Sequence, residues 1–171
     1  MASLLGSGFA DFAAAADPVV VIMSCAEDGD KPVWRYTTAP PPADWAAVKF
    51  NDSKWSEGPA GFGTPKTPGA RVATSWETGQ IWLRRSFTLY KNQRVGSFIL
   101  RIHHDDEAVV FINGNPVGRF KGYETGYVDR PLPPQVLQIL KPGMNSIAVS
   151  CLQKSGGQFI DVGIIDRNPT R

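Results

Sequence analysis

The residues best suited to chemistry stand together in the stretch HHDDEAVVFING, which begins at His103. Two histidines and three acids could ligate a metal ion, transfer protons or hydrogen-bond a ligand. Adjacent strand residues point to opposite faces, so His103 and His104 cannot easily ligate one ion, and the sequence has no third histidine. A hard cation held by Asp105, Asp106, Glu107 and carbonyls stays open, although no EF-hand spacing supports it. We therefore expect no cofactor, with a structural calcium ion as the open alternative.

Signatures of catalysis are missing from the sequence. It contains no G-x-S-x-G nucleophile motif and no G-x-x-x-x-G-K-[ST] phosphate loop. The Gly-rich stretch GFGTPKTPG at 61–69 lacks the strand–loop–helix context of a phosphate loop. Neither Cys25 nor Cys151 has a histidine partner in a known local signature. The sequence therefore predicts a protein that is not an enzyme.

Composition narrows the class of protein. With 171 residues, 42% of them hydrophobic and 20% charged, the chain is long and apolar enough for one globular domain. The net charge of +2 includes no block of basic residues, which argues against binding to nucleic acid or to an anionic membrane. Apolar runs such as VVVIM at 19–23 are too short to span a bilayer. Two cysteines permit one disulfide or two buried thiols, and the apolar neighbours Ile147 and Val149 favour a buried, unreactive Cys151.

The elements that must position these residues are short β-strands separated by Gly and Pro. Asn113-Gly114 is a favoured pair for a two-residue hairpin turn. We expect 97–103 to pair with 108–112 through a tight, solvated turn, and helical turns within 43–56 and 133–140. This spacing favours an antiparallel sandwich or barrel. The expected strands are 19–24, 33–37, 81–89, 97–103, 108–112, 116–120, 146–152 and 159–165.

Five stretches in order resemble a known family. The chain is similar to the galactose-binding-like jelly-roll domains attached to bacterial polysaccharide-degrading enzymes, and to the sugar-binding domain of glycoside hydrolase family 2. The resemblance covers about 33–165. It is carried by WRYTTAPPPADWAAVKFNDSKWSEGPAGFG (34–63), TSWETGQIWLRRSF (74–87), HHDDEAVVFING (103–114), LKPGMNSIAVSC (140–151) and GGQFIDVGI (156–164).

The resemblance implies an all-β fold, a two-sheet antiparallel jelly-roll β-sandwich spanning 18–166. Residues 1–17 would be a linker, a tag or a frayed segment, and 167–171 a C-terminal tail. The implied function is a non-catalytic carbohydrate-binding module that targets an attached enzyme to polysaccharide. Its partners would be that polysaccharide and a catalytic domain of the parent protein, secreted or held at the cell surface or in the periplasm. The alternative is an architectural domain that packs against a catalytic domain without binding sugar.

Alternation within the strands predicts which side chains form the core. Trp34 and Trp82 belong to the core rather than to a ligand platform. Arg84, Arg85 and Arg101 are either ligand contacts or members of ion pairs. The expected core is Leu83, Phe87, Phe98, Leu100, Ile102, Val110, Ile112, Ile147, Val149, Val162 and Ile164.

Strand direction predicts which loops meet. If successive strands run antiparallel, the loops 63–80, 103–107, 121–129 and 153–158 share one end of the sandwich. An aromatic ring among acids, an amide and a histidine suits a sugar, which needs a flat apolar face and hydrogen-bonding groups. The predicted carbohydrate-binding residues at this end are Trp76, His104, Asp105, Asp106, Tyr123 and Gln158.

Each of these residues has an expected role. Trp76 is the stacking platform, because ATSWETGQ surrounds it with small and polar residues. Asp105 and Gln158 exchange hydrogen bonds with ring hydroxyls, and His104 is a neutral partner near pH 7. The expected ligand is a neutral or weakly charged polysaccharide.

Overall fold

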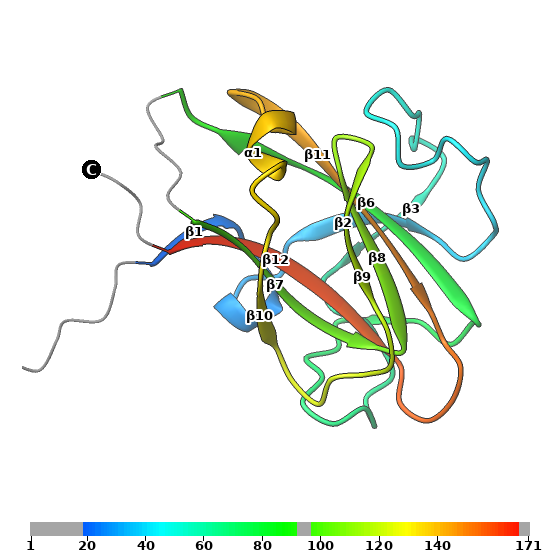
Figure 1. The fold of residues 1–171 in the computed structure, drawn as a ribbon. Helices are drawn as coiled ribbons and strands as arrows, with labels where there is room; N and C mark the ends of the chain where they lie inside the picture. Colours follow the sequence, from blue (N-terminus) through cyan, green and yellow to red (C-terminus); the bar gives the residue numbers. More distant parts are fainter. Residues whose placement is uncertain (1–18, 92–96, 168–171) are drawn as a thin grey trace, which may run out of the picture.

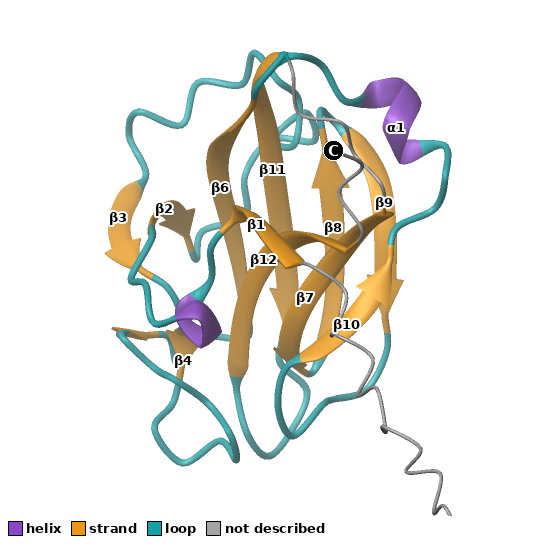
Figure 2. Ribbon diagram, turned by 90° about the vertical axis from the view of Figure 1, so that its left-hand side faces the viewer, coloured by secondary structure: helices purple, strands orange, loops and turns teal. Residues whose placement is uncertain are grey.

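The protein is a sandwich of two β-sheets, as the computed structural model in Figures 1 and 2 shows for residues 19–91 and 97–167. The segments 1–17 and 168–171, expected to be a linker and a tail, lie outside the described residues. Arg167, expected in the tail, is the last residue of a strand. The strands are β1 Val19–Met23, β2 Val33–Thr37, β3 Ser56–Pro59, β4 Phe62–Gly63, β5 Thr74–Ser75, β6 Gln80–Leu89, β7 Ser97–Asp105, β8 Glu107–Ile112, β9 Asn115–Phe120, β10 Val128–Pro131, β11 Gly143–Leu152 and β12 Phe159–Arg167.

Within the described residues, each sheet has six strands. The first has the order β10-β7-β12-β4-β5, with β1 also paired to β12, and the second has the order β3-β2-β6-β11-β8-β9. Figure 2 shows β1, β12, β7 and β10 in front of β6, β11, β8 and β9. All pairs are antiparallel except β4 with β5, which run parallel. The predicted all-β, two-sheet sandwich is thus confirmed.

The expected pairing of 97–103 with 108–112 is wrong. β7 pairs with β10 and β12 in the first sheet, whereas β8 pairs with β9 and β11 in the second. Only Asp106 separates the two strands, and both Asp105 and Asp106 are buried rather than solvated. The chain crosses from the first sheet to the second at this point. Ile102 of β7 therefore reaches the core from one sheet, and Val110 of β8 reaches it from the other.

The predicted hairpin at Asn113-Gly114 is confirmed. β8 and β9 pair antiparallel around it, and both turn residues have positive φ, 48° at Asn113 and 79° at Gly114. These angles suit the right-handed twist of the flanking strands, which explains the preference for Asn-Gly at this position.

The predicted core is confirmed at every position, because all eleven predicted side chains are buried. Trp34 and Trp82 are buried as well. The strands β3, β4, β5 and β10 were not predicted: SEGP, FG, TS and VDRP are too short or too polar to show alternation. Of the two expected helical turns, 133–140 contains α1 (Val136–Ile139), whereas 43–56 forms turns.

The two cysteines are free thiols, and both are buried. This confirms the burial expected for Cys151 and rules out the alternative of a disulfide between them. Burial raises the pKa of each thiol far above its ordinary value.

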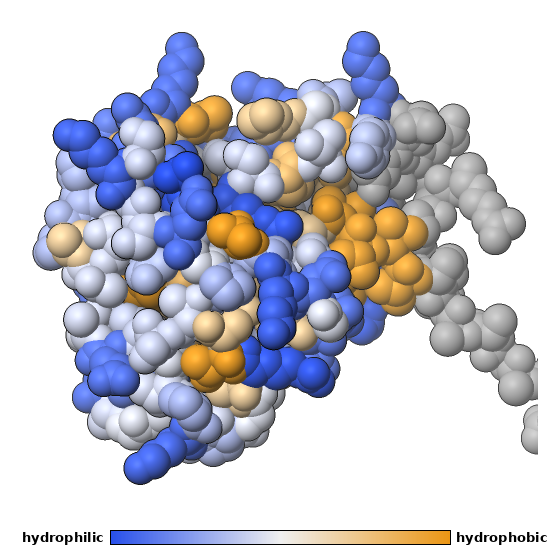
Figure 3. All heavy atoms as spheres, turned by 180° about the vertical axis from the view of Figure 1, so that it is seen from behind, coloured by the Kyte–Doolittle hydropathy of each residue, from blue (hydrophilic) through white to orange (hydrophobic). Residues whose placement is uncertain are grey.

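Strand β1, which pairs with β12, exposes apolar side chains. Val19, Val20 and Val21 of β1 are exposed, and Figure 3 shows an apolar patch where β1 forms that side of the molecule. The described helices, η1 (Ala26–Asp28, a 3-10 helix) and α1, are too short to cross a membrane.

Candidate ligand-binding site at the loop end

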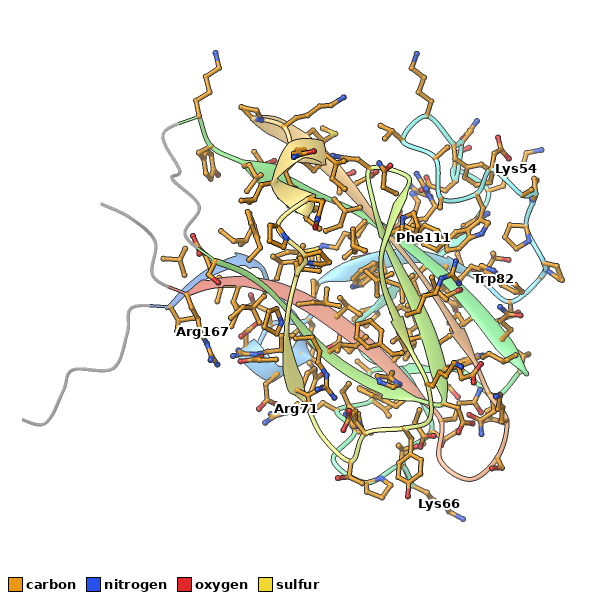
Figure 4. All side chains as sticks on the ribbon, viewed as in Figure 1. Lys54, Lys66, Arg71, Trp82, Phe111 and Arg167 are labelled. Carbon is orange, nitrogen blue, oxygen red and sulfur yellow. The ribbon has the colours of Figure 1, made fainter. Side chains whose placement is uncertain are left out.

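Four loops meet at one end of the sandwich, at the bottom of Figure 1 and near Lys66 in Figure 4. They enclose a cavity of about 380 Å³, which we call the loop-end pocket. The predicted convergence of these loops is confirmed. The pocket is lined by Pro68, Asp105, Asp106, Tyr123, Glu124, Thr125, Ser155, Gly156 and Gly157.

Main-chain hydrogen bonds hold the loops in place around the end of β7. The Glu124 N–H donates to the His104 carbonyl at 2.9 Å, and Asp105 and Tyr123 form an isolated antiparallel bridge. On the other side, the Thr64 N–H donates to the Gln158 carbonyl at 2.9 Å. The loops are therefore attached to strand ends rather than free.

Asp106 fixes the loop that follows β11. Its Oδ2 accepts hydrogen bonds from the backbone N–H groups of Lys154 at 2.6 Å and Ser155 at 3.0 Å. A buried carboxylate with two such donors is satisfied by the protein. Asp106 therefore positions the pocket wall and has less capacity left for a ligand.

Asp105 is different, because its carboxylate accepts no hydrogen bond from any described residue although the residue is only 5% exposed. Burial, and then the neighbouring charge of Asp106, raises the pKa of the Asp105 carboxyl, whereas His104 acts in the opposite direction. Gly157 lies against it so closely that an added Cβ would overlap Oδ2. The carboxylate oxygens are not fully enclosed by the protein, so a ligand or water in the pocket can donate to them.

Two tyrosines of the same loop differ in availability. Tyr123 is 65% exposed and forms the rim of the pocket. Tyr127 instead donates its hydroxyl to Asp161 Oδ2 at 2.6 Å, beneath η1. Tyr123, unlike Tyr127, lines the pocket, and an aromatic face is a surface on which sugar rings stack.

The exposure expected for Trp76 is wrong. Trp76 is 2% exposed and belongs to the core. Its indole Nε1 donates to Thr78 Oγ1 at 3.0 Å, and its backbone N–H donates to the Gly63 carbonyl at 3.2 Å. Trp76 directly follows β5, which pairs in parallel with β4, and its indole is buried in the core. The free energy gained by burying so large an apolar side chain decides its position, although its neighbours in the sequence are polar.

His104 and Gln158 are buried and do not line the pocket. The His104 ring packs against Phe120 and its Nδ1 hydrogen-bonds to the Asp106 carbonyl. Gln158 Nε2 donates to the Thr78 carbonyl at 2.7 Å. Of the six predicted residues, the structure therefore brings Asp105, Asp106 and Tyr123 together in the pocket, and their binding role stays a prediction.

Sequence reasoning missed the other lining residues. Glu124, which pairs with Arg130, and Gly157 carry no motif of their own, although the Gly156-Gly157 pair signals a turn at this end. For a cation, no group of three or more His, Cys, Asp or Glu side chains within 19–91 and 97–167 has a suitable arrangement. Because Asp106 and Glu124 already have partners in the protein, the groups of the described pocket that remain for a ligand are the Asp105 carboxylate and the Tyr123 ring.

No family model and no curated protein matches the sequence, but solved structures share its fold. A glycosyl hydrolase family 2 member from Bacteroides cellulosilyticus matches 78% of this chain with 20% of its own, at 16% identity and a TM-score of 0.56. A β-glucuronidase from Bacteroides uniformis matches 86% with 18% of its own, at 22% identity and a TM-score of 0.55. A β-glucuronidase from an uncultured Clostridium species matches 98% with 31% of its own, at 14% identity and a TM-score of 0.55.

This likeness concerns the fold. The chain spans about a fifth of the length of the first enzymes that it matches. The chain therefore shares its β-sandwich fold with one part of these family 2 glycoside hydrolases.

Proposed function

We propose that this chain is a non-catalytic accessory domain of a glycoside hydrolase, and that it binds carbohydrate in the loop-end pocket. The fold supports the first part, because the matched region is a small portion of each enzyme. The single observation that carries the second part is the buried Asp105 carboxylate, which faces the pocket without a donor from the protein. Such a domain would hold its enzyme on a polysaccharide, outside the cell or in the periplasm.

The charges of the pocket favour a neutral sugar. Asp105, Asp106 and Glu124 are its acidic lining residues, and its described lining contains no Lys, Arg or His. A sugar hydroxyl can donate to the Asp105 carboxylate while the ring stacks on Tyr123, whereas a carboxylate or sulfate would be repelled. Binding by one small pocket is expected to be weak, with a Kd on the order of micromolar to millimolar.

The test is calorimetry of the full chain against a panel of neutral plant and algal polysaccharides. Asp105→Asn is expected to weaken binding about tenfold or more, because a hydrogen bond to a charged acceptor contributes about 1.5–3 kcal/mol. The same change should leave the free energy of unfolding unchanged or higher, since it removes a buried charge. Gly157→Ala, whose Cβ would overlap Asp105 Oδ2, should also reduce affinity.

Matched controls separate the pocket from the rest of the surface. Asp44→Asn removes an exposed carboxylate elsewhere and should not change affinity. Tyr123→Ala should reduce affinity, whereas Tyr90→Ala, at an exposed tyrosine beyond the other end of β6, should not. If Asp105→Asn and Tyr123→Ala bind as tightly as the wild type, the pocket is not the site.

Acidification gives an independent check on the ionised form of Asp105. Because the pKa of its carboxyl is raised above the ordinary 3.8, affinity should begin to fall while the pH is still above 3.8. In Asp105→Asn this pH dependence should disappear. An affinity that is flat down to pH 3.8 would argue against a role for the carboxylate.

A second function is favoured by one observation, the exposed valines of β1. An apolar patch on an edge strand suits packing against another domain of the same protein. This is the architectural alternative, in which the domain binds no sugar. It is supported if no polysaccharide in a broad panel binds to the wild type.

A further inference from the structure

A second cavity lies at the opposite end of β8 from the loop-end pocket. Strand β8 begins directly after Asp106, which lines the loop-end pocket, and ends at the Asn113-Gly114 turn. Its 6 residues span about 20 Å. Between that turn and the segment 43–48 lies a cavity of about 360 Å³, which we call the hairpin-tip pocket. It shares no lining residue with the loop-end pocket.

Two contacts hold the segment 43–48 on the outer face of the second sheet. Arg84 and Phe111, the latter labelled in Figure 4, flank Ala148 in the register of that sheet. Arg84 Nη1 donates to the Trp45 carbonyl at 2.5 Å. The Trp45 and Phe111 rings pack edge to face, with their centroids 5.4 Å apart. The aromatic pair that lines the pocket is therefore held in place by the protein itself.

Small residues leave the space beside these two rings. Ala43, Ala46 and Ala47 line the pocket on the side of the segment, and Gly114 lines it on the side of the hairpin. A Cβ added at Gly114 would lie 3.6 Å from the Ala47 Cα, so the turn and the segment are in close contact. A methyl group or a glycine hydrogen is too small to fill the space beside a large ring, and a hollow remains.

Residues of the lining also carry unused hydrogen-bonding groups. Trp45 is half-buried, and its indole Nε1 forms no hydrogen bond within the described residues and is not fully enclosed. The Asn115 amide donates to the Asn113 carbonyl at 3.0 Å, and its exposed Oδ1 accepts no hydrogen bond from the described residues. The described lining contains no Lys, Arg or His, and the Asp44 carboxylate is exposed to water. The pocket therefore combines an aromatic pair with one free donor and one free acceptor.

We propose that the hairpin-tip pocket is a second carbohydrate site, which binds one unit of a neutral saccharide against the Trp45–Phe111 pair. The apolar face of a sugar ring packs on aromatic side chains, and its hydroxyls both donate and accept hydrogen bonds. An acidic sugar would find no cationic partner in the described lining. The inference rests on the proposed carbohydrate-binding function for its class of ligand. It makes the domain bivalent, and two sites about 20 Å apart would hold a polysaccharide more tightly than either site alone.

The experiment is an NMR titration of the ¹⁵N-labelled full chain, observing the tryptophan indole N–H signals. The probes are cellohexaose, mannohexaose and xylohexaose, and polyethylene glycol of similar length is the control that is not a sugar. Trp45→Phe and Trp55→Phe identify their two signals. We expect the Trp45 signal to shift and saturate with at least one hexasaccharide and to stay in place with polyethylene glycol. The Trp55 signal, from a half-buried indole outside the pocket, should not move.

Variants assign the site while the Trp45 signal still reports on it. Phe111→Leu should weaken the affinity about three- to tenfold, as expected for loss of an aromatic contact. Phe50→Leu, at a half-buried ring outside the lining, is the matched control and should leave it unchanged. If Phe111→Leu does not fold, Ala43→Leu decides in its place, because a larger side chain at this exposed lining position should occupy the hollow and weaken binding. Its control is Ala73→Leu, at an exposed alanine elsewhere.

Three results would overturn the proposal: a Trp45 signal that no hexasaccharide moves, an equal shift with polyethylene glycol, or an unchanged affinity in the Phe111 or Ala43 variant that folds. Asp105→Asn changes only the loop-end pocket and should leave the Trp45 titration as it is in the wild type. A Trp45 signal that stays in place while polysaccharide binding depends on Asp105 would contradict the second site alone. A Trp45 shift without any dependence of binding on Asp105 would contradict the loop-end site alone.

Discussion

At the scale of residues, the four consecutive polar side chains from His103 to Asp106 have four different surroundings. His103 lies on the outer face of β7 against Phe159 and Tyr127, whereas His104 faces inward against Phe120. Asp105 is left without a donor, and Asp106 holds two backbone N–H groups. The alternation of a strand separates the histidines, and the distant loops that contact each side chain decide the rest.

A prediction at this scale concerns His103 and pH. Its Nε2 hydrogen-bonds to the Glu124 carbonyl, and its Nδ1 is buried without a partner, so burial lowers the pKa of its imidazole below the ordinary 6.5. The unfolded chain binds a proton near pH 6.5 while the folded chain does not. The free energy of unfolding should therefore fall as the pH drops below 6.5, by at most about 1.4 kcal/mol per pH unit from this group.

Urea unfolding between pH 7.5 and 5 measures this effect. His103→Gln, whose amide can still donate to the Glu124 carbonyl, should lose that part of the pH dependence. An identical slope in the wild type and the variant would show that His103 does not carry it.

At the scale of elements, a buried carboxylate on β12 joins three separate segments. Asp161 Oδ2 accepts from the Tyr127 hydroxyl at 2.6 Å and from the Ala26 N–H at 2.7 Å, and Oδ1 accepts from the Val162 N–H at 2.8 Å. Burial raises the pKa of the Asp161 carboxyl, and these donors oppose the rise. The carboxylate thereby attaches η1 and the loop before β10 to the outer face of the first sheet.

The prediction at this scale is the effect of Tyr127→Phe. It leaves a buried carboxylate short of one donor, so the free energy of unfolding should fall by about 1–3 kcal/mol. Tyr36→Phe is the matched control, because Tyr36 packs through its ring on Phe62 and its hydroxyl forms no hydrogen bond within residues 19–91 and 97–167. Its effect should stay within about 0.5 kcal/mol. Equal effects in chemical denaturation would show that the Tyr127 hydroxyl is not a structural link.

At the scale of the whole molecule, the two sheets enclose Cys151 completely. Its thiol is buried and its pKa is raised by that burial, so a thiol reagent can reach it only when the sandwich opens. We expect Cys151 in a Cys25→Ser variant to be labelled at a rate that rises with urea as global unfolding does. Rapid labelling in native buffer would contradict the closed core.

Much of the fold was predictable because strand alternation and turn chemistry are local. The inward residues Leu100 and Ile102 of β7, and the Asn113-Gly114 turn, follow from backbone geometry alone. Successive strands also alternate in direction whether or not they pair. For this reason the loops around the loop-end pocket were grouped correctly even though β7 and β8 belong to different sheets.

The sequence by itself thus determined the β-sandwich class, the core faces of the longer strands and the end at which the loops converge. Only the tertiary structure decided which strands share a sheet, that Trp76 is buried, and that Asp105 rather than Asp106 keeps a free carboxylate. The physical reason is that alternation is set by each residue and its neighbours in the chain. Exposure and hydrogen-bond partners depend instead on segments far away in sequence. Examples are the loop at 153–158, which donates hydrogen bonds to the Asp106 carboxylate, and the strand β4, whose Gly63 carbonyl accepts from the Trp76 N–H.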